Sequence, residues 1–233
     1  MSSDLYGNTS FADLWYRNRS TELCNFLPPS GVTNVLHADV AGLANLHTIP
    51  TQMLERSMNK PGLFEAVAEW KPDMFLVAGC YHMVPKRWRE LAPAYGMHAS
   101  LLPDYSGGAP LVWAMINGET KTGISLFQMD DGVDFGPIAG QKEEPIYPGD
   151  TIATLYDRIE ERGVELLRNK LPQLANGTLK LKLQLQNETK RRIMPQRSPK
   201  DGLNRLAAGC RKYRPLHPRP DQALPWRVYH LGN

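Results

Sequence analysis

Residues Asp73 to Cys80 read DMFLVAGC, a short and nearly continuous apolar run that follows a proline. Such a run is typical of a strand that a sheet buries on both faces. The stretch before it, Pro61 to Trp70 (PGLFEAVAEW), begins with proline and spaces its large apolar residues as one face of a helix does. The stretch after it, Pro85 to Ala92 (PKRWRELA), begins in the same way and predicts a second helix. A buried strand between two helices indicates an α/β fold.

The same alternation continues along the chain. Short strands are predicted over 96–101 (GMHASL) and 122–129 (TGISLFQM), with a helix over 109–116 (APLVWAMI) between them. Strands that alternate with helices predict crossover connections and helices on both faces of a sheet. The sequence therefore predicts a mainly parallel, doubly wound sheet of the Rossmann-like type.

The pattern changes after residue 150. Asp150 is the predicted N-cap of a long helix that ends at Asn176-Gly177. Beyond it, leucines alternate with lysine or glutamine over 179–186, which is the period of a strand with one apolar face. A returning strand over 189–194 completes a predicted β-hairpin. We therefore expect an α/β core over residues 1–177 and a second module, the hairpin with a proline-rich tail, over 178–233.

The composition fits a compact protein and excludes several classes. The chain has 233 residues, of which 42% are apolar, and its formal charge of +3 is too weak to predict a nucleic-acid partner. The apolar run MFLVAGC is far shorter than the roughly 18 residues of a membrane span. Three cysteines that lie far apart argue against a disulfide framework and against a zinc cluster. The polar start of the chain lacks the pattern of a signal peptide, so we expect a cytoplasmic protein without a membrane partner.

Ionisable residues follow two of the predicted strands, where ligands bind in doubly wound sheets. His98 ends one strand, and the loop Asp130 to Asp134 (DDGVD) follows another. A histidine beside a carboxylate is an ordinary arrangement for general base catalysis, because the carboxylate orients the ring and stabilises its protonated form. A histidine at a strand end is more often a surface or core residue, so this pattern alone gives only a candidate site.

The stretch from 98 to 141 carries a much more specific pattern. It reads HASLLPDYSGGAPLVWAMINGETKTGISLFQMDDGVDFGPIAGQ and resembles the signature region of the folate-dependent formyltransferases. The separation of His98 and Asp134 is the one that this family uses for its catalytic pair. The other matching residues are Ser100, Leu101, Leu102, Pro103, Gly107, Gly108, Pro110, Thr122, Gly123, Asp131, Gly132 and Gly136.

This resemblance implies a reaction and a set of site residues. It implies transfer of a formyl group from 10-formyltetrahydrofolate to a primary amine, with His98 as the general base, Asp134 holding its ring, and no metal. The residues implied for the folate are Tyr81, Met83, Val84, Asp131, Gly132 and Val133. The residues implied for the acceptor are Pro103, Tyr105, Ser106, Gly107, Gly108, Gln196 and Arg197. Structural alternatives remain for several of them, because Asp-Gly clusters and paired glycines are also usual in plain turns.

The resemblance also favours one acceptor. Residues 194–202 (MPQRSPKDG) look closest to the enzymes that formylate nucleotide-linked amino sugars of the dTDP-4-amino-4,6-dideoxyglucose type. Methionyl-tRNA formylation is disfavoured, because that group carries a further domain and few residues follow Gly202 here. Glycinamide ribonucleotide formylation fits the length but does not explain 194–202. By the same resemblance we expect a homodimer through the carboxyl-terminal strands, with Leu181 and Leu183 at the contact.

Two departures from the family pattern leave alternatives open. Gly96 stands where the family has the asparagine that stabilises an oxyanion, and loss of one such donor costs about 2.7–4 kcal/mol. Either a backbone N–H or a water takes its place, or the chain is an impaired relative that binds folate or a nucleotide. Residues 1–30 show no apolar strand, which predicts a sheet shortened at its first element or a truncated coding sequence.

Overall fold

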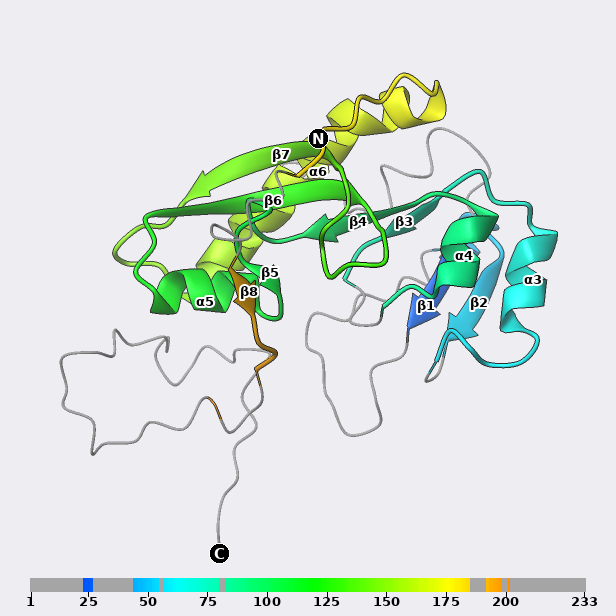
Figure 1. Ribbon diagram of the computed structural model, residues 1–233, viewed down its shortest axis with the longest axis horizontal. Coiled ribbons are helices and arrows are strands. Elements are labelled where there is room, and N and C mark those ends of the chain that lie inside the picture. Colours follow the sequence, from blue (N-terminus) through cyan, green and yellow to red (C-terminus); the bar gives the residue numbers. More distant parts are fainter. Residues whose placement is uncertain are drawn as a thin grey trace, which may run out of the picture. The chain divides into compact units, whose positions relative to one another are not determined.

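The structure is a computed structural model of the 233-residue chain. It describes residues 23–26, 44–54, 57–79, 83–184, 192–197 and 201, which Figure 1 draws as a coloured ribbon. The chain divides into two compact units, one of residues 1–72 and 80–85 and one of residues 73–79 and 86–233.

The first unit contains a parallel strand pair and a helix. Strand β1 (Leu23–Phe26) pairs in parallel with β2 (Thr51–Leu54). The helix predicted over 61–70 is confirmed as α3 (Leu63–Glu69), which begins after Gly62 and buries Leu63 and Val67. Strand β1 lies within residues 1–30, where no strand was predicted. Its sequence, LCNF, has neither an apolar run nor an alternation, so its pairing with a distant segment defines it.

The second unit is built on a four-stranded sheet in the order β3-β4-β6-β7. These strands are β3 (Phe75–Val77), β4 (Ala94–His98), β6 (Lys121–Gln128) and β7 (Ile138–Pro145). Helix α4 (Lys86–Leu91) joins β3 to β4, which run in parallel as the crossover pattern predicted. The α/β class is thus confirmed, with the predicted strands and helices of 73–129 close to their expected places.

The sheet is mixed, however, because β6 and β7 are antiparallel to their neighbours. After β4 the chain turns through residues 99–109, and α5 (Pro110–Ile116) and the Asn117–Gly118 turn return it in the opposite direction. Hydrophobic periodicity carries no information on strand direction, so the parallel expectation for 122–129 came only from the helix–strand alternation. Strand β7 was not predicted at all, since its polar sequence IAGQKEEP lacks a strong strand pattern.

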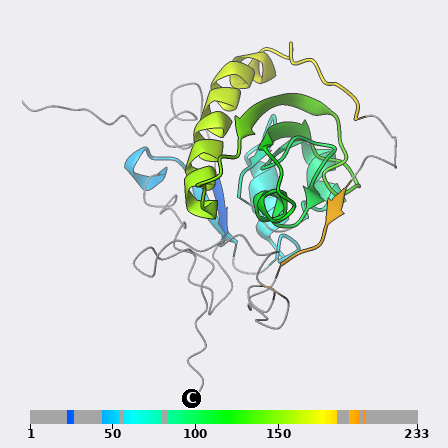
Figure 2. The same ribbon diagram turned by 90° about the vertical axis from the view of Figure 1, so that its left-hand side faces the viewer.

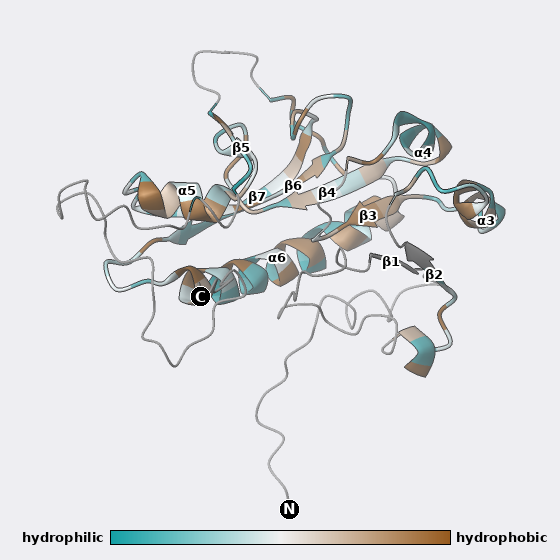
Figure 3. Ribbon diagram, turned by 90° about the horizontal axis from the view of Figure 1, so that it is seen from below, coloured by the Kyte–Doolittle hydropathy of each residue, from teal (hydrophilic) through white to brown (hydrophobic). Residues whose placement is uncertain are grey.

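The long helix α6 (Ile152–Ala175) packs across β6 and β7, as Figures 2 and 3 show. Its inward face includes Leu155, Ile159 and Leu167. Its N-cap is Thr151 and not Asp150: the Thr151 hydroxyl accepts from the Thr154 N–H at 3.2 Å, and the Thr154 hydroxyl accepts from the Thr151 N–H at 3.1 Å. None of the helices that the structure describes is long and apolar enough to cross a membrane.

The segment after α6 differs from the predicted hairpin. Its first arm lies beside β7, where Lys182 and Ile138 exchange backbone hydrogen bonds of 2.7 and 2.8 Å. Its second arm is β8 (Ile193–Met194), which pairs in parallel with β5 (Ser106–Gly107). Within residues 178–184 and 192–197, the arms therefore pair with the core and not with each other, because the core offers each an open strand edge. Residues 185–191, between the arms, lie outside the described residues.

Asp150 belongs to an ion-pair network at the start of α6. Its carboxylate accepts from Arg158 at 2.7 and 2.8 Å, and Arg158 also donates to Glu144 at 2.6 Å. Arg162 donates to the same buried Glu144 at 2.8 Å. The hydrogen bonds from Arg158 lower the pKa of Asp150 to about 2, and further bonds from the Tyr147 N–H and Thr154 act in the same direction.

We predict that Asp150 stabilises the fold only above acidic pH. Because folding lowers its pKa from an ordinary value near 3.8 to about 2, its contribution is complete above pH 4 and disappears as the pH falls toward 2. The wild type should therefore exceed Asp150→Asn in the free energy of unfolding by about 2 kcal/mol at neutral pH, and the difference should shrink below pH 4. Urea unfolding over a pH series measures it, with the exposed Asp157→Asn as the control. A difference that stays constant with pH contradicts the prediction.

Candidate active site

The structure brings together the two residues that the sequence singled out as a catalytic pair. His98 is the last residue of β4, and Asp134 lies in the loop between β6 and β7. The Nδ1 atom of His98 is 3.5 Å from Oδ2 of Asp134, and both side chains are largely shielded from solvent. The other ring nitrogen, Nε2, is 2.8 Å from the backbone oxygen of Tyr105.

These contacts define the state of the imidazole ring. A carbonyl oxygen only accepts hydrogen bonds. Nε2 of His98 therefore carries a hydrogen atom and donates a hydrogen bond to the Tyr105 carbonyl. In the neutral ring, Nδ1 is then the nitrogen with a free lone pair. A proton that arrives at Nδ1 comes to rest beside the Asp134 carboxylate. The arrangement thus suits a base that becomes charged during a reaction.

Asp134 is fixed through both its side chain and its backbone. Its Oδ2 accepts from the Gly107 N–H at 2.8 Å, and its carbonyl accepts from the side-chain amide of Gln184 at 2.9 Å. The residue has a φ of 51°, in the left-handed region. Gly107 has a φ of 93°, and a Cβ there would collide with the Met194 carbonyl. Gly107, expected to contact the acceptor, therefore also holds the Asp134 carboxylate.

Buried hydroxyl groups hold the turn that follows His98. The Ser125 hydroxyl, on β6, donates to the Ser100 carbonyl at 2.6 Å and accepts from the Leu102 N–H at 3.1 Å. Gln141, on β7, donates to the same hydroxyl at 2.8 Å and to the Leu102 carbonyl at 2.9 Å. Sequence reasoning missed Ser125 and Gln141, although a serine inside the apolar strand TGISLFQM was a signal for the first.

Tyr105 lies at the centre of a second group of polar contacts. Its hydroxyl donates to Glu119 at 2.6 Å, and the Arg192 guanidinium lies 4.1 Å from the centre of its ring. Arg192 also forms two hydrogen bonds of 2.9 Å with the Asp104 carboxylate. Burial raises the pKa of Tyr105, and the hydrogen bond from its hydroxyl lowers the pKa of Glu119. Tyr105 was expected to bind the acceptor, but its ring is buried in this group and its carbonyl binds His98.

The other expected acceptor residues lie near helix α5. The Gly108 N–H donates to the Met194 carbonyl at 3.0 Å, and a Cβ on Gly108 would lie 2.6 Å from the Cα of Gln196. The Arg197 guanidinium lies 4.9 Å from the ring centre of Trp113, on α5. Pro103 and Ser106 belong to the turn itself, since the Ser106 hydroxyl donates to the Pro103 carbonyl at 3.1 Å. Residues 103–108 and 194–197 are thus brought together in the structure.

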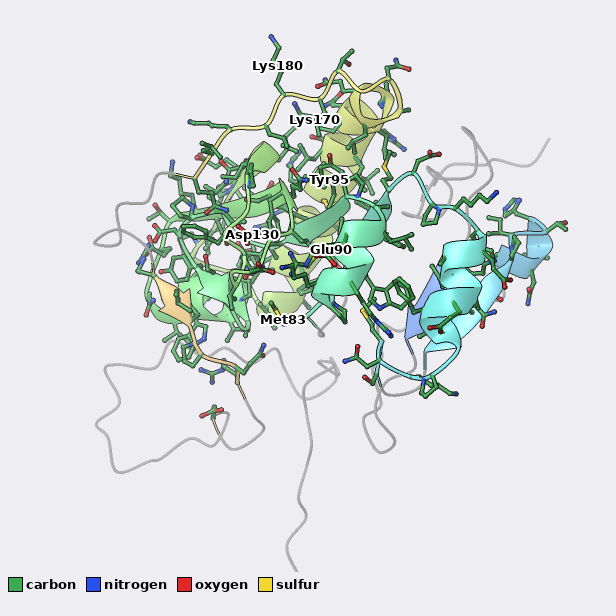
Figure 4. All side chains as sticks on the ribbon, turned by 45° about the vertical axis from the view of Figure 1, so that its right-hand side comes forward. Met83, Glu90, Tyr95, Asp130, Lys170 and Lys180 are labelled. Carbon is green, nitrogen blue, oxygen red and sulfur yellow. The ribbon has the colours of Figure 1, made fainter. Side chains whose placement is uncertain are left out.

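The residues expected to bind folate are divided between the two units. Met83, which is exposed, and Val84, which is buried, belong to the first unit, and Tyr81 lies outside the described residues. Asp131, Gly132 and Val133 belong to the second unit, in the loop after β6. Asp131 forms an ion pair with Arg89 of α4, which lowers the pKa of the carboxyl. Figure 4 shows this loop, at Asp130, beside the helix that carries Glu90.

Gly96 lies two residues before His98, on the same face of β4. It is buried, and its partner across the sheet is Phe127. A Cβ on Gly96 would lie 3.0 and 3.2 Å from two atoms of the Phe127 ring and 3.4 Å from Met129 Cγ. The Phe127 ring therefore fills the space that a side chain at position 96 would need.

No group of three or more histidine, cysteine, aspartate or glutamate residues that could hold a metal occurs in the described parts of the chain.

Sequence comparison relates the chain to known enzymes. Residues 31–171 match the family described as formyl transferase. The methionyl-tRNA formyltransferase of Trichlorobacter lovleyi is 38% identical over 142 residues, which are 60% of this chain and 45% of the relative. That of a Geobacillus species is 39% identical over 133 residues, 56% of this chain and 40% of the relative. The chain thus spans less than half the length of these curated relatives.

Solved structures share the fold. The sugar 3N-formyl transferase WlaRD, solved in the presence of dTDP and 5-N-formyl-THF, superimposes with a TM-score of 0.60 at 18% identity, covering 78% of this chain and 61% of that one. HypX from Aquifex aeolicus in complex with tetrahydrofolic acid gives 0.56 at 20% identity, covering 67% and 27%. A sugar N-formyltransferase from a Shewanella species gives 0.56 at 22% identity, covering 69% and 61%. The family match extends over more than half of the chain, and the protein belongs to the formyl transferase family.

Proposed function

We propose that this protein transfers a formyl group from 10-formyltetrahydrofolate to a primary amine. The observation that carries the proposal is the geometry of His98, whose Nε2 is bound to the Tyr105 carbonyl while Nδ1 lies 3.5 Å from the Asp134 carboxylate. The attacking amine has to lose a proton as its bond to the formyl carbon forms. His98 accepts that proton at Nδ1, and Asp134 stabilises the charged ring. The proton then passes to N10 of the folate as the bond between N10 and the formyl carbon breaks.

The folate supplies the formyl group on its N10 atom, and the loop after β6 is the proposed place for its pterin ring. This loop carries Asp134, whose carboxylate lies 3.5 Å from the His98 ring, so a ring bound on the loop would lie beside the proposed catalytic pair. The chemistry of the loop fits a flat, hydrogen-bonding ring. Val133 is partly exposed and apolar, and Gly132, where a Cβ would lie 2.6 Å from Phe135 Cβ, keeps the backbone tightly turned. Asp131 belongs to the same loop and to the proposed folate set, and the resemblance names Tyr81, Met83 and Val84 as further residues to test.

The first candidate acceptor is a nucleotide-linked amino sugar such as dTDP-4-amino-4,6-dideoxyglucose. Its support is the segment 194–197, which packs on Gly107 and Gly108 beside the carboxylate of Asp134. Arg197 and Gln196 lie in this segment, and a guanidinium is well shaped for a pyrophosphate. The second candidate is methionyl-tRNA, the substrate in the names of the curated relatives. For either acceptor we propose a cytoplasmic reaction.

The two acceptors can be separated directly. Purified protein is mixed with 10-formyltetrahydrofolate and, in parallel reactions, with a panel of dTDP- and UDP-linked amino sugars or with charged methionyl-tRNA. Mass spectrometry then detects the gain of one formyl group on the sugar or on the amino acid released from the tRNA. Transfer to neither acceptor, with folate still bound, favours the impaired relative.

We predict that His98→Asn abolishes transfer and leaves folate binding intact, because the change removes the base and not the pocket. The rate should fall roughly a hundredfold or more. Turnover measures the first effect, and quenching of protein fluorescence by the folate measures the second. His47→Asn, in the first unit, controls for the loss of a histidine. A His98→Asn variant that keeps more than about a tenth of the turnover shows that the base is another group.

The residue at position 96 affects how an oxyanion formed in the proposed reaction is stabilised. The family asparagine at this position stabilises an oxyanion, and here the Phe127 ring occupies the corresponding space. An asparagine at position 96 would thus press its Cβ against the Phe127 ring, and a smaller residue at position 127 would relieve this close contact.

We predict that positions 96 and 127 are energetically coupled. Gly96→Asn should destabilise the wild-type background and cost less when Phe127→Leu is also present, with a coupling energy of about 1 kcal/mol or more. Urea unfolding of the two single variants and the double variant measures this coupling. Free energies that add within about 0.5 kcal/mol contradict it. Turnover of the double variant adds a second result: it rises above that of the wild type only if no other group already serves the oxyanion.

We also propose a homodimer through the segment after α6. Leu181, Leu183 and Ile193 are exposed in the single chain, and Leu183 exposes 77% of its surface. Apolar side chains gathered on one short segment favour association, and a two-fold contact would bury the row of each copy against its mate.

Replacing Leu181 and Leu183 with lysine should convert this dimer to monomers, because two like-charged rows then face each other. Light scattering of the wild type and the double variant measures the change. Lys180→Glu with Lys182→Glu, on the same segment, is the control for altered charge alone. A wild-type mass of 26.2 kDa, that of one chain, would refute the dimer.

A further inference from the structure

Gln184 is the buried polar residue of an otherwise exposed segment. The neighbouring Leu181, Lys182 and Leu183 are exposed, whereas Gln184 keeps only 7% of its surface accessible. Its side-chain nitrogen donates to the Asp134 carbonyl at 2.9 Å and to the Gly136 carbonyl at 2.7 Å. The buried Gln184 amide therefore links two backbone carbonyls of the same loop.

The sheet determines where this amide lies. The hydrogen bonds between Lys182 and Ile138 align the segment antiparallel to β7, so that residue 184 comes opposite residue 136. A Cβ on Gly136 would collide with the Gln128 carbonyl, so only glycine fits at this place. The loop around Asp134 is therefore fixed to β6 on one side and to Gln184 on the other.

The contact matters because of the conformation of Asp134. Its φ of 51° is uncommon for a residue with a side chain, and such a conformation persists only when neighbouring groups hold it. The Gly107 N–H holds the carboxylate, and Gln184 holds the carbonyl of the same residue. Together they direct Oδ2 toward Nδ1 of His98.

We propose that Gln184 is a positioning residue for the Asp134–His98 pair; the catalytic meaning of that pair rests on the function proposed above. Its amide nitrogen fixes the backbone at Asp134 and so determines the distance between the carboxylate and the imidazole. Both of its partners are carbonyl oxygens, which only accept hydrogen bonds, so the position requires a donor. Its own oxygen has no hydrogen-bond partner among the residues that the structure describes, so the nitrogen alone makes the contact.

Three substitutions separate this role from general packing. Gln184→Met keeps the length and the apolar stem and removes the donor. Gln184→Glu places oxygen atoms against the two carbonyls. Lys182→Met, at an exposed residue of the same segment, is the matched control, because it adds the same side chain at a position that makes no side-chain contact with the Asp134 carbonyl.

The first experiment needs no substrate. The ring nitrogens of His98, assigned with His98→Asn, are observed by NMR in the wild type and the variants at one pH. We expect Gln184→Met and Gln184→Glu to move the Nδ1 resonance in the direction in which Asp134→Asn moves it, and Lys182→Met to leave it unchanged. An Nδ1 resonance that stays in place in a folded Gln184→Met, even with a lower melting temperature, reduces Gln184 to a packing residue and overturns the proposal.

The second experiment is kinetic. Loss of positioning should lower kcat roughly ten- to a hundredfold and leave KM for the folate within about twofold. Gln184→Asn, which keeps the amide on a shorter stem, should retain more activity than Gln184→Met, and it replaces Gln184→Met if that variant does not fold. A raised KM with unchanged kcat overturns the proposal. If the wild type transfers formyl to no amine, the proposed function fails, and the NMR comparison still decides the role of Gln184.

Discussion

The Asp134 carboxylate connects the parts from which the site is built. One of its oxygens accepts the Gly107 N–H and faces the His98 ring, so a single group joins the end of β4, the glycine turn before α5 and the loop after β6. Three non-glycine residues in these segments, Tyr105, Ala109 and Asp134, have positive φ angles. Such backbone conformations persist only where neighbouring groups hold them. Here those groups are buried hydroxyls, a guanidinium and an amide.

The residues that could be predicted are those whose signal is local. The prolines at the starts of α4 and α5, the glycine turn after α6 and the apolar run of β3 all gave elements close to the observed ones, although β3 is only half-buried because it lies at the edge of the sheet. His98 and Asp134 were found because a motif fixes their spacing. Local signals were insufficient where contacts with distant residues determine the structure. Thr151, and not Asp150, is the N-cap of α6, because Arg158 binds the aspartate. Strand β7 is defined by its pairing with β6.

The groups that hold the segments around His98 and Asp134 were the hardest to predict, because their partners are distant in the sequence. Arg192 contacts Tyr105 and Gln184 contacts Asp134, across separations that no periodicity reveals. Both follow α6, in the segment that the leucine alternation assigned to a separate module. The leucine alternation correctly identified an extended segment. The backbone of this segment binds the edge of β7 at Ile138, and its buried Gln184 amide binds the loop that carries Asp134.

This arrangement has a consequence for specificity. The segment that supplies Gln184 and Arg192 continues into Gln196 and Arg197, which lie against Gly108 and Trp113. A change that adapts 194–197 to a different acceptor must therefore leave β8 paired with β5, since that pairing places Gly107 at the Asp134 carboxylate. Under the proposed function, the side chains at 196 and 197 are thus free to vary with the acceptor, whereas the pairing with β5 constrains the backbone of 193 and 194.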